Sequence, residues 1–256
     1  MTAEALGRSR RSEAGVVALL LGLAAAGWVL SDARMGDMAA GPGGELGGVG
    51  WFTVSWGSMM AAMMLPAITP MVVAYSRRHT LGGATAAFAA GYLVTWVVVG
   101  LLAYAVIEGI RSLAPGVLAW EEAGRYVAAT VIAAAGLYQL TAGKRTFLRR
   151  CRDGRAFVRE HWRAGRRGAL RMGVEHGGVC VGCSWALMAA LLALGAMNLI
   201  WMAVVAALIA SERLLPSSDA ARRAGALVLL ALAIAVAVAP GDVPGLTVPG
   251  SQMGMQ

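Results

Sequence analysis

Residues 51–75 read WFTVSWGSMMAAMMLPAITPMVVAY, a stretch that contains no charged residue. About 20 mostly apolar residues are enough for an α-helix to cross the hydrocarbon core of a bilayer, so this stretch predicts a transmembrane helix. Pro66 and Pro70 lie in its second half, where each removes a backbone hydrogen-bond donor, and we expect the helix to kink there. Further apolar stretches lie on both sides of it.

The composition of the whole chain is that of a membrane protein. Charged residues make up only 14% of the 256 residues, against about one quarter in soluble domains. The 34 glycines suit helices that pack closely in lipid. We therefore predict an all-α fold, a polytopic bundle of about seven transmembrane helices, with a range of five to seven because several spans are short. The candidate spans are Gly15–Leu30, Trp51–Tyr75, Gly83–Ile107, Tyr126–Leu140, Gly177–Leu194, Met197–Ala210 and Ala224–Ala239.

Loops rich and poor in Lys and Arg alternate along the chain. Of the net charge of +8, the largest share lies in residues 141–175, which hold eleven basic and three acidic residues. Because Lys and Arg keep loops in the cytoplasm, this alternation predicts a cytoplasmic N-terminus and an outside C-terminus. The predicted organisation is a cytoplasmic N-terminal arm (1–14), a membrane domain (15–239) with a basic cytoplasmic loop (141–175), and a disordered tail (240–256). Basic loops beside a bilayer meet anionic lipid, so the charge does not indicate nucleic-acid binding.

The second span carries a group of methionines. Met60, Met63 and Met64 are spaced i, i+3, i+4 and therefore share one helix face. Thioethers are soft ligands that select Cu(I). Methionine also fills helix cores, and packing is the alternative interpretation of this face.

The fifth span opens with a second group of soft ligands. His176, Cys180 and Cys183 are spaced i, i+4, i+7, which places an imidazole and two thiols on one helix face. Such side chains bind copper or zinc. Two alternatives remain open: small cysteines that only pack, and a redox-active Cys-x-x-Cys pair. If the second and fifth spans are neighbours, Met63 and Cys183 lie at similar depth from the cytoplasmic face.

Four other features carry weaker signals, the first three of them on the cytoplasmic side. Glu212 ends the sixth span, and an ion pair with Arg213 or Arg171 is the simplest interpretation of it. The basic loop interleaves apolar side chains with arginines, which predicts an amphipathic helix lying on anionic lipid. Cys151 and His161 in that loop have no partner at ligand spacing. The loop after the first span contains a few acidic residues and methionines near Asp37, and we expect it to be flexible.

Several stretches together resemble a known family. They are Trp56 with Met59–Pro66; Tyr138–Thr141 with Lys144 and Cys151; Gly173, His176 and Gly177; Cys180–Met188; and Met197, Asn198, Glu212 and Pro216. They resemble a bacterial family of predicted metal-binding integral membrane proteins of unknown function, over about Trp51–Pro216. The resemblance implies metal binding in a bacterial membrane, without naming the metal. The family often has a cysteine where this chain has Ser184, so the resemblance implies one thiol fewer here.

The sequence thus predicts a multi-pass protein of the bacterial inner membrane that binds a soft transition metal on Met60, Met63, Met64, His176, Cys180 and Cys183. Copper is favoured, and zinc is the alternative metal. The protein's role would be metal handling: transfer, insertion or translocation, with the lipid bilayer and a protein partner or a second copy as its contacts. No ATP-binding motif is present that would drive transport. The alternatives are a membrane thiol oxidoreductase using Cys180 and Cys183, and a non-catalytic membrane anchor subunit for a partner protein. A non-enzymatic role is the favoured expectation.

Overall fold

The computed structural model describes residues 3–35, 46–76, 82–119, 123–195, 199–215, 218–243 and 246, and in these ranges the regular structure is entirely helical. The long helices are α1 (Ala3–Met35), α2 (Val49–Ser76), α3 (Gly82–Leu113), α5 (Arg125–Leu140), α8 (Gly165–Ala193), α9 (Leu199–Leu214) and α10 (Ser218–Val238). Shorter helices are α4 (Pro115–Leu118), α6 (Ala142–Arg152) and α7 (Gly154–Glu160), and η2 (Pro240–Asp242) is a single 3-10 turn. The predicted all-α helical bundle is confirmed.

Five of these helices are long and apolar enough to cross a membrane: α1 (from Glu13 to Ala33), α2, α3, α8 and α10. A sixth span is formed if α5 and α6 count as one broken helix. Helix α9 has 16 residues, about 24 Å at ~1.5 Å per residue, which is shorter than the hydrocarbon core of about 30 Å. The described helices therefore support five or six spans, inside the predicted range but below the central expectation of seven.

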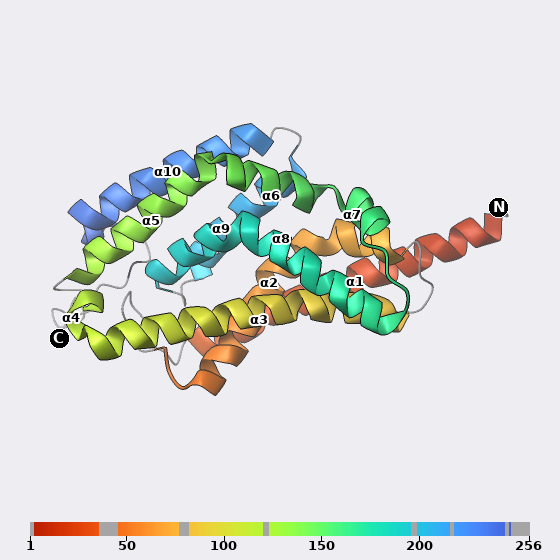
Figure 1. Cartoon of the computed structure of the whole chain (residues 1–256), viewed down its shortest axis with the longest axis horizontal. Coiled ribbons are helices and arrows are strands. Elements are labelled where there is room, and N and C mark those ends of the chain that lie inside the picture. The colour runs from red at the N-terminus through yellow and green to blue at the C-terminus, as the bar shows by residue number, and fades with distance from the viewer. Residues whose placement is uncertain are drawn as a thin grey trace.

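The helices lie roughly along one direction, with α5 beside α10 on one flank, α3 on the other and α8 and α9 between them (Figure 1). Helices α3 and α8 make the closest contact. A Cβ added at Gly173 would lie 2.1 Å from the carbonyl oxygen of Phe88, and one added at Gly91 would lie 2.1 Å from that of Leu170. Only glycine lets the two backbones approach this far, as small residues do between membrane helices.

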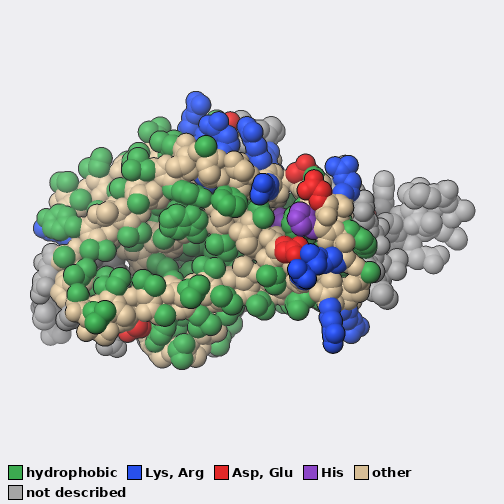
Figure 2. Space-filling model, viewed as in Figure 1, with side chains coloured by type: hydrophobic (Ala, Val, Ile, Leu, Met, Phe, Trp, Pro, Cys, Tyr) green, Lys and Arg blue, Asp and Glu red, His purple; other side chains and the backbone are tan. Residues whose placement is uncertain are grey.

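The surface divides into an apolar part and a charged end. Large apolar side chains on α3 and α10, such as Leu102, Val106 and Leu227, are at least 60% exposed. Lys and Arg side chains of the visible face gather instead at the end where α6, α7 and the first half of α8 lie (Figure 2). We call this end the basic end; its exposed arginines are Arg145, Arg149, Arg150, Arg152, Arg159, Arg166, Arg167 and Arg171.

The basic loop folds against the bundle rather than standing apart from it. Its apolar residues Leu148, Phe157 and Val158 are buried in the core, with Phe147 and Trp162 packed against it. The prediction that these side chains face lipid was wrong, because α6 and α7 turn their apolar faces toward α8 and α2 instead. The start of the predicted disordered tail also packs: Val243 and Leu246 are buried after η2. The rest of that tail and the residues around Asp37 lie outside the described residues.

Candidate metal centre

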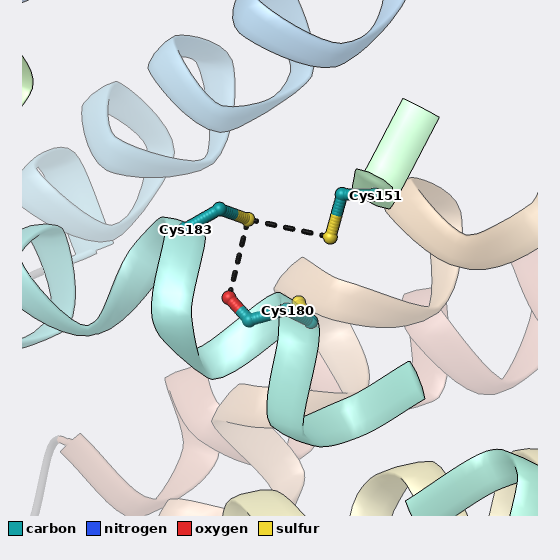
Figure 3. Close-up of side chains that lie close together, drawn as sticks. All are labelled: Cys151, Cys180 and Cys183. Atoms are coloured by element: carbon teal, nitrogen blue, oxygen red, sulfur yellow. Dashed lines mark hydrogen bonds between the residues drawn. The ribbon is translucent and has the colours of Figure 1, made fainter. Parts of the chain in front are cut away.

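Three cysteines from two helices meet inside the bundle. Cys151 lies on α6, and Cys180 and Cys183 lie one turn apart on α8. All three Sγ atoms are within 4.8 Å of one another, and all three side chains are buried. Figure 3 shows the Cys183 sulfur pointing at that of Cys151, and the two are 3.4 Å apart. We call these three residues the thiol cluster.

The chain brings Cys151 to α8 through a bend at Thr141. This residue ends α5 in an extended conformation, and its hydroxyl accepts a hydrogen bond from the Lys144 backbone N–H at 3.2 Å, which caps α6. The axis turns by 68° between α5 and α6. Lys144 then fixes α6 in place, because its Nζ donates to the carbonyl oxygen of Cys183.

Arg213 at the end of α9 supplies a positive charge at the cluster. One of its terminal nitrogens lies 2.7 Å from the Cys180 sulfur and 3.3 Å from that of Cys183. The same nitrogen is 3.3 Å from the Ser184 hydroxyl, and the Tyr92 hydroxyl is 2.9 Å from the Cys180 sulfur. The guanidinium therefore donates to sulfur and places one positive charge beside the atoms that would hold a metal ion.

A buried ion pair lies next to the thiol cluster. Lys144 Nζ is 2.7 Å from a carboxylate oxygen of Glu212, and the two side chains are 1% and 2% exposed. The other carboxylate oxygen accepts from Gln139 at 2.6 Å. The expected pairing of Glu212 with Arg213 or Arg171 was wrong: Arg213 turns to the thiols, and Arg171 pairs with Glu175 at 3.3 Å.

His176 lies near the cluster without belonging to it. Its side chain is 1% exposed and packs among the rings of Phe88, Tyr92 and Phe157, with centroid separations of 5.0 to 6.2 Å. Its Nδ1 has no hydrogen-bond partner among the residues described. The group of ligand atoms within 4.8 Å holds the three cysteines and does not include this imidazole.

The predicted methionines are all buried in α2, where Met60 and Met64 are completely enclosed and Met63 is 4% exposed. The helices that α2 contacts most extensively are α1, α3, α7 and α9. A ligand role for these three sulfurs stays a prediction. Met71, also on α2, lines a pocket together with Cys151.

Sequence reasoning missed two members of the site. Spacing within one helix identified Cys180 and Cys183, but Cys151 lies 29 positions before Cys180 and reaches it only through the bend at Thr141. A signal for it existed, since Cys151, Lys144 and Glu212 all belong to the stretches that carry the family resemblance. Arg213 had no such signal, because a single arginine at a helix end reads as an interfacial charge.

A family model described as "PpoB2: Copper chaperone" matches residues 53–236, a range that contains every residue of the thiol cluster and Arg213. No curated protein and no solved structure matches the chain.

Proposed function

Since this chain belongs to the copper chaperone family, whose model covers most of its length, we propose that it is an integral membrane copper chaperone that holds Cu(I) on the thiol cluster and passes it to a protein partner. The observation that carries the proposal is the approach of three buried sulfurs to within 4.8 Å of one another, beside a buried arginine.

The donor set favours copper over zinc. Thiolates are soft ligands and select Cu(I), whereas structural zinc sites need four ligands in a tetrahedron. Among the His, Cys, Asp and Glu side chains that the structure describes, the group at the cluster contains three ligands. Three sulfurs would leave the fourth position of a zinc ion open.

Charge balance explains why Arg213 belongs to such a site. Three thiolates around Cu(I) carry a net charge of −2, which is costly to hold in an apolar interior. The guanidinium at 2.7 Å from the Cys180 sulfur reduces this charge to −1 and satisfies sulfur lone pairs that copper leaves free. Arg213 thereby stabilises the loaded state without adding a ligand.

Membrane insertion is supported by composition and surface. Five or six helices are apolar and long enough to span, and the sides of α3 and α10 expose large apolar residues that lipid would cover. We place the basic end in the cytoplasm by the distribution of arginines, with the N-terminus inside and the C-terminus outside the bacterial inner membrane. This topology requires seven crossings, so the bent α5–α6 pair and the shorter α9 must also carry the chain across. Helix α9 ends at the basic end, where Arg152 donates to the carbonyl oxygen of Glu212.

A copper titration of the purified full-length protein tests the proposal. We expect one Cu(I) to be held against a competing chromogenic chelator, and serine substitution of Cys151, Cys180 or Cys183 to weaken binding at least about tenfold. Ser184→Ala is the matched control, because this hydroxyl also lies against Cys183 and Arg213 but is not a soft ligand. Equal affinity in the wild type and all three serine variants would refute the assignment.

A separate experiment tests the alternative that the protein is a thiol oxidoreductase. The sulfurs of Cys151 and Cys183 are 3.4 Å apart, so this pair is a second redox candidate beside the predicted Cys180 and Cys183. Thiol trapping in cells should find all three cysteines reduced if the protein carries copper. A disulfide that forms and disappears with the redox state of the cell would instead support the alternative.

A further inference from the structure

A pocket of about 400 Å³ leads from the basic end of the molecule to the thiol cluster. Its walls come from the last turns of α2, the end of α6, the start of α7 and the end of α9. Cys151 and Arg213 lie in its lining, so two groups of the candidate copper site can be reached through it. This volume is in the range of pockets that hold small molecules, which are far larger than a bare ion.

The polar groups of the pocket fit an anion. Arg152 and Arg213 both line it, together with one carboxylate, that of Asp153. Asp153 already accepts a hydrogen bond from the backbone N–H of Ala156 at 3.0 Å. Arg152 is held over the pocket by a 3.1 Å hydrogen bond to the carbonyl oxygen of Glu212. The Nε–H of Arg213 is buried and has no acceptor among the residues described, so a donor is left for a ligand.

The remaining wall combines sulfur with apolar carbon. Met71 on α2 is 3% exposed, and its Sδ lies against Gly154, where an added Cβ would come within 2.8 Å. Its thioether and the Cys151 thiol therefore belong to the same cavity. A small ligand in the pocket would meet guanidinium groups at one side and soft sulfur at another.

We propose that this pocket binds the copper donor itself, a small anionic thiol that carries Cu(I), with its carboxylates on Arg152 and Arg213 and its copper against Cys151. The inference rests on the proposed copper site and names the chemical class that fills it. The transfer is a ligand exchange. The Cys151 sulfur forms a bond to copper while one bond from copper to the donor thiolate breaks. The proton of the Cys151 thiol passes to the departing thiolate, and copper stays Cu(I).

Glutathione and its diethyl ester provide a matched pair of probes, because they have the same thiol and differ in their two carboxylates. We would mix purified full-length protein with Cu(I) held by either compound, separate the protein from the small thiol by rapid desalting at set times, and measure the copper that stays with the protein. The rate should saturate with Cu(I)–glutathione and be about tenfold slower with the ester. S-methylglutathione, which keeps the carboxylates but lacks a free thiol, should inhibit competitively.

Two arginine variants distinguish binding in the pocket from attraction of anions by the overall positive charge of the basic end. Arg152→Gln should raise the half-saturating concentration of Cu(I)–glutathione about fivefold and leave the rate with the ester unchanged. Arg149→Gln is the control, because Arg149 is exposed on the same helix but does not line the pocket. An equal effect of both variants would mean that the basic end attracts anions without a binding site and would overturn the inference.

The outcomes also separate this inference from the proposed function. If the protein takes one Cu(I) from a chelator, but both glutathione donors deliver copper at the same rate and S-methylglutathione has no effect, the pocket assignment fails and the copper site stands. If no copper is retained from any donor or chelator, the copper site itself fails.

Discussion

The ion pair of Lys144 and Glu212 gives the sharpest test of how the site is held together. The pair is 2.7 Å long and almost completely buried. Removing one partner of a buried pair leaves an uncompensated charge, which typically costs about 3–5 kcal/mol. Lys144 also donates to the Cys183 carbonyl oxygen, so its loss frees α6, which carries Cys151, from α8. We expect Lys144→Met and Glu212→Gln each to destabilise the protein by about 3–5 kcal/mol.

The double variant Lys144→Met with Glu212→Gln distinguishes a coupled pair from two separate contacts. With neither charge present, its destabilisation should be smaller than the sum of the single variants by about 2–3 kcal/mol. The free energy of unfolding can be measured by titrating a denaturing detergent into mixed micelles. Copper affinity should fall about tenfold in Lys144→Met, as it does when groups that orient metal ligands are lost.

Arg171→Gln is the control for this experiment, because it breaks an exposed pair. Arg171 is 67% exposed, and Glu175 keeps a second partner in Arg163 at 3.0 Å. Its loss should change stability by no more than about 0.5 kcal/mol. If the single variants at Lys144 and Glu212 behave like this control, or if their effects simply add, the pair does not hold the site together.

Three further predictions follow from the fold. Gly173→Ala should prevent folding, because the new Cβ would lie 2.1 Å from the Phe88 carbonyl oxygen. Gly178→Ala on the same helix is the control and should fold, because its Cβ would meet nothing within 4 Å. Size-exclusion profiles in detergent compare the two variants. The double variant Met63→Leu with Met64→Leu should fold, because volume and apolarity are preserved, and its copper affinity decides whether these sulfurs bind metal. Reporter fusions should place residues 141–175 in the cytoplasm and the C-terminus outside; a cytoplasmic C-terminus would contradict the proposed topology.

The helical bundle was predictable because hydropathy over about 20 residues is a strong signal. The apolar stretch 51–75 became α2 (Val49–Ser76) almost residue for residue. The start of α8 was not predictable in this way, whereas its end at Ala193 lies one residue from the predicted Leu194. It begins at Gly165, well before the predicted Gly177, because its first turns continue past the apolar stretch into charged sequence at the basic end. Hydropathy reports which residues lipid accepts and carries no information on how far a helix extends into charged sequence.

The site was only half predictable, because regular spacing reveals ligands on one helix and not between helices. Cys180 and Cys183 share a face of α8 by their spacing alone. The third cysteine depends on one break, where Thr141 caps α6 and turns it back toward α8. A basic loop with a threonine in it can form many structures, so no pattern in residues 141–175 predicts this one. The loop that was expected to meet lipid instead brings Cys151 to the thiol cluster.

Glu212 and Arg213 show most clearly what the sequence could not convey. Adjacent opposite charges suggest one local ion pair, but successive residues of a helix point about 100° apart. The carboxylate of Glu212 therefore meets Lys144 on α6, while the guanidinium of Arg213 meets the sulfurs of α8. Because Lys144 neutralises Glu212, the charge of Arg213 remains available to the thiol cluster. The buried ion pair thus has two effects, since it anchors the helix that bears Cys151 and leaves one positive charge for the thiolates that would hold copper.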